Sequence, residues 1–218
     1  MQPQFWLDRW RTGQIAFHQS SVDRSLRNHW PALDVGAGSR VFAPLCGKSL
    51  DLLWLRDQGL EVVGVELAAA AVEAFFLENG VPARRRAGTP FDAYDAPGLR
   101  LLCGDFFALT PALLDRVDAV YDRAALISWA PALRSGYVAH LATLMSPGTR
   151  VLLITLEYPQ SQMAGPPFAV PVEEVTRLYA PQFEILEIGR QDILPHEPRL
   201  RAKGLTELFE VCYQLARL

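Results

Sequence analysis

Glu66 and the turn Leu45-Cys46-Gly47-Lys48 have the residue types and spacing of a site for an adenosine-containing ligand. Glu66 ends an apolar stretch and follows the turn by about 20 residues, the separation at which an acidic residue reaches a bound ribose. A carboxylate there can accept hydrogen bonds from both ribose hydroxyls, and like-charge repulsion disfavours a 2′-phosphate. A solvated carboxylate at a strand end is the simpler alternative, and the spacing favours the ribose role.

Asp122 and Arg123 stand at the end of another apolar stretch, residues 117–122. A guanidinium at the carboxyl end of a strand can bind a ligand carboxylate or polarise an anionic acceptor atom. An Asp-Arg pair on the protein surface explains the same two residues equally well. The residues alone leave both interpretations open.

Aromatic side chains gather near the N-terminus, where Phe5, Trp6, Trp10 and Phe17 precede His18. Trp6 and Trp10 are four residues apart and therefore share one face of a helix. Aromatic faces attract cations, including a sulfonium, most strongly where water is excluded. Taken alone, such a stripe is more often core packing, and a lone histidine is more often structural than a base.

The elements that must position these residues follow an alternating pattern of apolar stretches and helical periods. This pattern predicts a doubly wound α/β fold with a mostly parallel seven-stranded sheet and helices on both faces. Ligands bind such sheets beyond the carboxyl ends of the strands. We expect one domain over residues 1–218, with an N-terminal helical cap over 1–37 and an α/β core over 38–218. The expected strands are 40–45, 61–66, 99–103, 117–122, 150–157, 183–191 and an antiparallel closing strand within 206–215, and the expected helices are 49–58, 68–79, 131–145 and 172–179.

Two other glycine-containing segments fit nucleotide binding less well. The segment 33–38 (LDVGAG) precedes the first strand, so we interpret it as a connector. The segment 46–49 (CGKS) lacks the earlier glycine of a phosphate loop, because Phe42 stands at that position, which argues against ATP. A nicotinamide-dependent oxidoreductase would need a G-x-G-x-x-G turn after the first strand, and none is present.

Composition restricts the class of protein further. Half of the residues are hydrophobic and the formal net charge is −3, which predicts a large core and no nucleic-acid partner. The three cysteines form no disulfide or zinc pattern, and no apolar run is long enough for a membrane helix. We therefore expect a cytoplasmic protein that does not act at a membrane, with a monomer as the default. The run Arg84–Arg86 is interpreted as a charged turn.

Several motifs together resemble the thiopurine S-methyltransferase family, in its bacterial branch, and they cover nearly the whole chain in the right order. The resemblance implies a class I, Rossmann-like methyltransferase that uses S-adenosyl-L-methionine and releases S-adenosyl-L-homocysteine. The matching motifs are Trp6-x3-Trp10-x2-Gly13-x3-Phe17-His18-Gln19, the RVFAPLCGKS segment at 40–49, VGVE at 63–66, DRAAL at 122–126, GPPF at 165–168 and LFE at 208–210.

The resemblance also implies roles for individual residues. Arg199 matches a family arginine that lies near the acceptor, with Arg201 as the neighbouring alternative. The sequence departs from the family pattern at Ala124, where glycine is more frequent, and at Asp105, where small polar residues occur. The residues implied to bind the methyl donor are Trp10, Leu45, Glu66 and Arg123, with Trp6 and Gly47 lining the same pocket, Asp105 and Phe106 beside the adenine, and Phe17 facing the substrate.

Methyl transfer from a sulfonium is an in-line displacement that requires alignment of the reacting atoms and exclusion of water. Such positioning is worth about 7–11 kcal/mol of barrier. The sequence contains neither a G-x-S-x-G elbow nor a metal-ligand cluster. We hypothesise that Arg123 and Arg199 stabilise the thiolate form of a small thiol substrate. The N-terminal cap is predicted to become ordered on binding.

Other activities remain compatible with these residues. The main alternative acceptor is a selenium or tellurium species, which would give a role in metalloid detoxification. A non-catalytic adenosine-binding module is a third possibility, and the Asp122-Arg123 pair with the aromatic cap argues against it.

Overall fold

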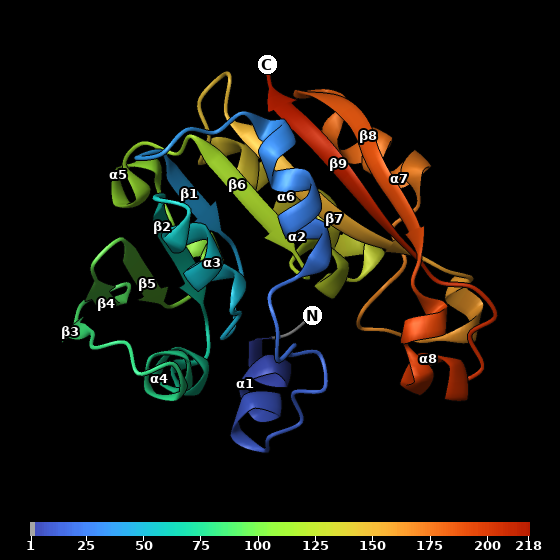
Figure 1. The fold of residues 1–218 in the computed structure, drawn as a ribbon, viewed down its shortest axis with the longest axis horizontal. Coiled ribbons are helices and arrows are strands. Elements are labelled where there is room, and N and C mark those ends of the chain that lie inside the picture. The colour runs from blue at the N-terminus through green and yellow to red at the C-terminus, as the bar shows by residue number, and fades with distance from the viewer. Residues whose placement is uncertain (1–2) are drawn as a thin grey trace.

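Five parallel strands form the centre of a nine-stranded sheet in the computed structural model, which describes residues 3–218 (Figure 1). The order across the sheet is β3-β4-β5-β2-β1-β6-β7-β9-β8. The predicted doubly wound α/β fold is therefore confirmed. The parallel strands are β1 (Arg40–Ala43), β2 (Glu61–Glu66), β5 (Leu99–Cys103), β6 (Ala119–Arg123) and β7 (Arg150–Glu157).

Two long antiparallel strands close one side of the sheet. They are β8 (Phe183–Asp192) and β9 (Phe209–Arg217). β9 pairs with β7 on one side and with β8 on the other, both antiparallel. This confirms the closing antiparallel strand that the apolar pattern near the C-terminus predicts.

The other side of the sheet carries a hairpin that the sequence interpretation missed. It consists of β3 (Arg84–Arg86) and β4 (Asp92–Ala96), and β4 pairs antiparallel with β5. The expected count of seven strands was therefore too low, and the charged turn proposed for Arg84–Arg86 is wrong. These arginines can form a strand because Arg85 and Arg86 pair across the hairpin with Asp92 and Asp95, each at 2.7 Å.

Alternate residues of β1 show why helices cover both faces. Val41 packs with residues from the helices of one face and Phe42 with residues from those of the other. None of the helices within residues 3–218 is long and apolar enough to cross a membrane. The α-helices are α1 (Pro3–Arg11), α2 (Arg24–His29), α3 (Asp51–Asp57), α4 (Ala69–Glu78), α5 (Pro111–Leu114), α6 (Pro131–Thr143), α7 (Val172–Tyr179) and α8 (Pro198–Ala202), and the 3₁₀ turns are η1 (Trp30–Leu33), η2 (Phe106–Ala108), η3 (Leu126–Ser128), η4 (Gln160–Gln162) and η5 (Leu194–His196).

The N-terminal segment has two parts that differ in packing. α2 and η1 contribute Leu26, Trp30 and Leu33 to the core, each at most 5% exposed. α1 has no buried residue. Figure 1 shows α1 beyond the carboxyl ends of β1 and β6, the edge of the sheet where a ligand is expected.

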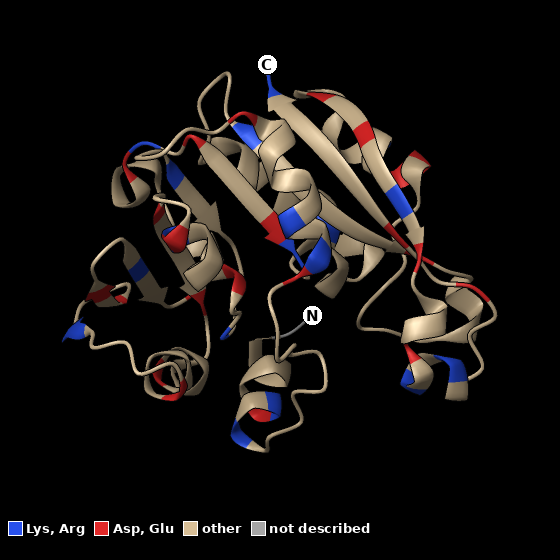
Figure 2. Ribbon diagram, in the orientation of Figure 1, with Lys and Arg blue, Asp and Glu red and all other residues tan. Residues whose placement is uncertain are grey.

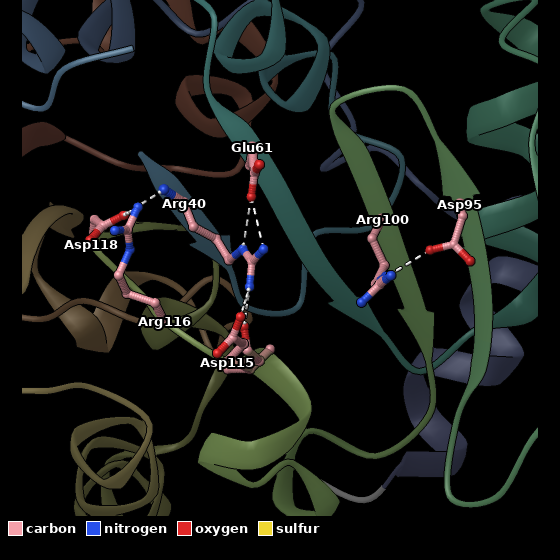
Figure 3. Close-up of polar contacts among 8 residues, drawn as sticks. Arg40, Glu61, Asp95, Arg100, Asp115, Arg116 and Asp118 are labelled. Atoms are coloured by element: carbon pink, nitrogen blue, oxygen red, sulfur yellow. Dashed lines mark hydrogen bonds and ion pairs between the residues drawn. The ribbon is translucent and has the colours of Figure 1, made fainter. Parts of the chain in front are cut away.

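The opposite edge of the sheet is held by ion pairs (Figure 3). Arg40 at the start of β1 contacts Glu61 of β2 at 2.8 Å and Asp115 after α5 at 3.0 Å, while its backbone N–H donates to Asp118 at 2.8 Å. Arg116 also pairs with Asp118. These partners join the amino ends of the central strands, away from the expected ligand edge.

Candidate functional site

The turn after β1 is built on two residues in the left-handed region. Leu45 has φ +49° and Gly47 has φ +54°. A non-glycine residue with positive φ is strained, and such strain is concentrated at functional sites. The Cys46 N–H donates to the carbonyl of Val65 at 3.0 Å, which ties the turn to β2. β1 is therefore shorter than the predicted strand 40–45, because the chain turns at Leu45.

Glu66 at the end of β2 is fixed by this turn. Its side chain is 6% exposed, and its two carboxylate oxygens accept separate backbone hydrogen bonds, from Gly47 at 2.9 Å and from Ala68 at 2.8 Å. Burial raises the pKa of Glu66, although these backbone hydrogen bonds act in the opposite direction. The carboxylate is thus held in one orientation at the carboxyl edge of the sheet.

The N-terminal aromatic residues come together over the turn. The Phe17 ring meets Trp6 and Trp10 edge to face, with centroids 5.5 and 5.6 Å apart. Trp10 packs on Gly47 so closely that a Cβ added to Gly47 would lie 3.1 Å from its Cζ2 atom. Because Gly47 also bonds Glu66, four of the predicted donor-site positions, Trp6, Trp10, Gly47 and Glu66, belong to one continuous cluster.

His18 lies beside this cluster and is half-buried. Burial lowers the pKa of His18, and the nearby charges of Lys48 and Arg123 lower it further against the opposing charge of Glu78. The surroundings of His18 therefore favour the uncharged form of the imidazole. Lys48 itself pairs with Glu78 at 2.7 Å.

Arg123 at the end of β6 is held by two buried carboxylates. Its Nε lies 3.3 Å from Asp23 and its Nη1 lies 4.0 Å from Asp51. The Asp51 carboxylate also accepts a hydrogen bond from the Tyr121 hydroxyl at 2.9 Å. Figure 2 shows charged residues gathered where β6 ends, next to α2. The sequence interpretation missed Asp23 and Asp51, and only the helix-cap pattern at Asp23 could have drawn attention to one of them.

Asp122, the neighbour of Arg123, belongs to the core. It is fully buried, and its two oxygens accept hydrogen bonds from Tyr137 at 2.7 Å and from the Leu126 N–H at 3.1 Å. Burial raises the pKa of Asp122 to about 6, although both hydrogen bonds lower it. The alternative of an Asp122-Arg123 surface pair is therefore wrong, because the two side chains have different partners.

Asp105 and Phe106 follow β5 with different roles. The exposed Asp105 side chain accepts from the Phe107 N–H at 3.0 Å and so caps η2. The Phe106 ring is 5% exposed and packs in the core against Tyr137, with centroids 5.1 Å apart. The Phe106 ring is consequently not free to stack on a base, and its backbone is the part that could meet an adenine.

Arg199 and Arg201 lie on α8, and both are exposed. Within residues 3–218, no hydrogen bond or ion pair joins Arg199 to another predicted site residue. The structure therefore does not bring Arg199 together with Arg123, and its role near an acceptor stays a prediction.

A cavity of about 620 Å³ opens elsewhere, near the end of β7 and the start of β9. Glu157, Tyr158 and Phe209 are among the residues that line it. None of the predicted site residues does. The candidate functional site is therefore the cluster of Trp6, Trp10, Gly47 and Glu66, and not this cavity.

Comparison with known proteins identifies the family of this chain. A family model described as "Thiopurine S-methyltransferase (TPMT)" matches residues 1–218. A thiopurine S-methyltransferase of Nitrosospira multiformis is 48% identical over 215 residues, covering 99% of this chain and 98% of that protein. One of Bordetella parapertussis is 48% identical over 218 residues and covers all of both chains.

Solved structures extend the comparison to the fold. A SAM-dependent methyltransferase from Anabaena variabilis superposes with a TM-score of 0.69 at 13% identity, covering 99% of this chain and 95% of that chain. This likeness identifies the fold as that of class I methyltransferases. Together with the full-length match to the family model, it assigns the protein: the chain belongs to the thiopurine S-methyltransferase family.

Proposed function

We propose that this protein transfers a methyl group from S-adenosyl-L-methionine to the sulfur of thiopurines or other small heterocyclic and aromatic thiols. The observation that carries the proposal is the joint placement of Glu66, Gly47 and Trp10 at the carboxyl edge of the sheet, with Arg123 nearby. The family membership supports the same activity.

The chemistry of Glu66 fits the methyl donor. Each of its carboxylate oxygens accepts one backbone hydrogen bond, and a carboxylate has about four acceptor sites. The remaining acceptor positions would serve the hydroxyls of a ribose. Leu45 and Gly47 would contribute backbone from the turn, and the exposed Asp105 with the backbone of Phe106 would lie beside the adenine.

When bound, S-adenosyl-L-methionine supplies a methyl group on a sulfonium sulfur. The residues of this chain exclude water and orient the two reactants. Trp10 packs on the turn after β1, Phe17 packs on Trp10, and Trp6 packs on Phe17. Aromatic faces attract a cation in a desolvated site. Phe17, which is 40% exposed, offers a surface for stacking of a flat acceptor ring.

Arg123 is the residue we propose to act on the acceptor. A fixed guanidinium favours the thiolate over the thiol and so lowers the pKa of the acceptor sulfur. It also remains available to a ligand carboxylate. Arg199 would add a second positive charge if α8 approaches the acceptor. We propose residues 1–218 as one catalytic unit. A monomer in the cytoplasm stays a prediction from the sequence.

A turnover experiment tests the proposed acceptor. Purified protein is incubated with S-adenosyl-L-methionine and either 6-mercaptopurine or selenite, and the products are identified by mass spectrometry. We expect S-methylated mercaptopurine and S-adenosyl-L-homocysteine in equal amounts. Methylation of the selenium species alone would replace the thiopurine proposal by the metalloid one. The absence of any methylated product would contradict both.

A further inference from the structure

Asp23 uses its two carboxylate oxygens for different purposes. Oδ1 accepts the Leu26 N–H at 3.0 Å and caps the start of α2. Oδ2 lies 3.3 Å from Nε of Arg123. The residue is only 4% exposed, so this ion pair is shielded from water and from salt.

A second buried carboxylate completes the support of the guanidinium. Asp51 is 1% exposed, its Oδ2 lies 4.0 Å from Nη1 of Arg123, and its Oδ1 accepts the backbone N–H of Asp23 at 2.7 Å. The shortest approaches of the two carboxylates are therefore to Nε and to Nη1, which lie on different sides of the guanidinium. Within residues 3–218, no group accepts a hydrogen bond from the Arg123 guanidinium, so its N–H groups remain available to a ligand.

We propose that Asp23 is a positioning residue for Arg123, fixing the guanidinium through Oδ2 while Oδ1 starts α2. This inference rests on the role proposed above for Arg123 in methyl transfer. An arginine side chain has large rotamer freedom, and a partner that restrains it before binding reduces the entropy lost when the ligand arrives. Asp23 touches no reacting atom and acts through Arg123.

The position of Asp23 in the chain gives this contact a second consequence. Asp23 is the last residue of the segment that connects α1 to α2. Its contact with Arg123 therefore links the N-terminal segment, which carries Trp6, Trp10 and Phe17, to the end of β6. Displacing Asp23 therefore loosens Arg123 even though the sheet is intact.

Two substitutions distinguish the helix-capping hydrogen bond of Asp23 from its ion pair with Arg123. Asp23→Asn keeps a good helix cap, because asparagine caps helices as well as aspartate does, but it removes the charge opposite Arg123. Asp23→Glu keeps the charge and weakens the cap. The matched control is Asp118→Asn, which removes a carboxylate paired with Arg116 at the opposite edge of the sheet (Figure 3).

We expect Asp23→Asn to lower kcat/KM for 6-mercaptopurine by about 10- to 100-fold, the cost of misplacing an orienting group. The Tm should also fall, because Arg123 loses one partner of a shielded ion pair. Asp23→Glu should retain more activity despite a lower Tm, and Asp118→Asn should keep the wild-type kcat/KM. The second readout is the Nε–H resonance of Arg123 in ¹H–¹⁵N spectra, assigned by its loss in Arg123→Lys. This resonance should be sharp in the wild type and shifted or broadened in Asp23→Asn.

Wild-type kcat/KM and an unchanged Arg123 resonance in Asp23→Asn would overturn the proposal and leave Asp23 as a helix cap only. The resonance is measured without ligand, so it tests the contact even if the wild type methylates no thiol. Failure of the proposed function and failure of this inference are thereby distinguished.

Discussion

Trp10 packs directly on Gly47, the residue whose N–H donates to Glu66. The contact is tight: a Cβ on Gly47 would lie 3.1 Å from Trp10 Cζ2, so Trp10 would have to move by a few tenths of an ångström. It is the point where the aromatic cap meets the turn after β1. Gly47 therefore contacts both the aromatic side chain of Trp10 and the buried carboxylate of Glu66.

Gly47→Ala should weaken donor binding by moving Trp10 away from the turn. The substitution also places alanine at φ +54°, in the left-handed region, which costs about 1–2 kcal/mol. Gly80→Ala is the matched control, since Gly80 has φ +62° and nothing within 4 Å of an added Cβ. We expect similar losses of stability in both variants and a raised donor Kd only in Gly47→Ala. An equal donor Kd in the two variants would show that the contact with Trp10 does not matter for binding.

Glu66→Gln should raise the donor Kd because the amide can no longer accept hydrogen bonds on both sides. A hydrogen bond to a charged group contributes about 1.5–3 kcal/mol, which corresponds to about 10- to 150-fold in Kd. Glu61→Gln, at the other end of β2, is the control and should bind normally. The measurement is calorimetric titration with S-adenosyl-L-methionine. A Kd for Glu66→Gln equal to that of the control would remove Glu66 from the binding site.

The raised pKa of Asp122 leads us to expect a specific dependence of the protein's stability on pH. Burial raises the pKa of Asp122 from its ordinary 3.8 to about 6. The folded state therefore binds the proton more tightly than the unfolded state, so this group's contribution to stability is full below about pH 4 and is lost as the pH rises to about 6.

Asp122→Asn removes this titration, and urea unfolding at several pH values measures the difference. Relative to Asp122→Asn, the wild type should lose about 2–3 kcal/mol between about pH 4 and 6 and then stay level. A difference that does not vary with pH, or that rises across this range, would contradict the raised pKa.

Ala124→Gly should stabilise the protein. Ala124 follows Arg123 with φ +63°, in the left-handed region that disfavours a Cβ. Relief of this strain exceeds the added freedom of glycine in the unfolded chain, for a net gain of about 0.5–1 kcal/mol. The Tm reports the change, and a lower Tm than the wild type would show that the turn after Arg123 tolerates alanine without strain.

The central strands could be predicted because each is a short apolar run followed by a helical period. The spacing between Glu66 and the turn that contains Gly47 was then enough to predict that the two lie close together. The hairpin β3–β4 could not be predicted in this way, because Arg84–Arg86 has no apolar pattern and owes its pairing to aspartates across the hairpin.

The partners of the site residues could not be predicted from the sequence either. Arg123 is held by Asp23 and Asp51, which lie far from it along the chain, and nothing in their local pattern indicates the contact. Phe106 shows the reverse case, since the family resemblance implied a place beside the adenine while its ring packs in the core against Tyr137. Asp122, the neighbour of Arg123, is likewise a core residue.

The most direct test of the account is a calorimetric titration of the wild-type protein and of Glu66→Gln with S-adenosyl-L-methionine. The account predicts one donor bound per chain in the wild type and a Kd at least about tenfold higher in the variant, matching the loss of one hydrogen bond to a charged group. No detectable binding by the folded wild-type protein would contradict the proposed function and the roles given to Glu66, Gly47 and Trp10.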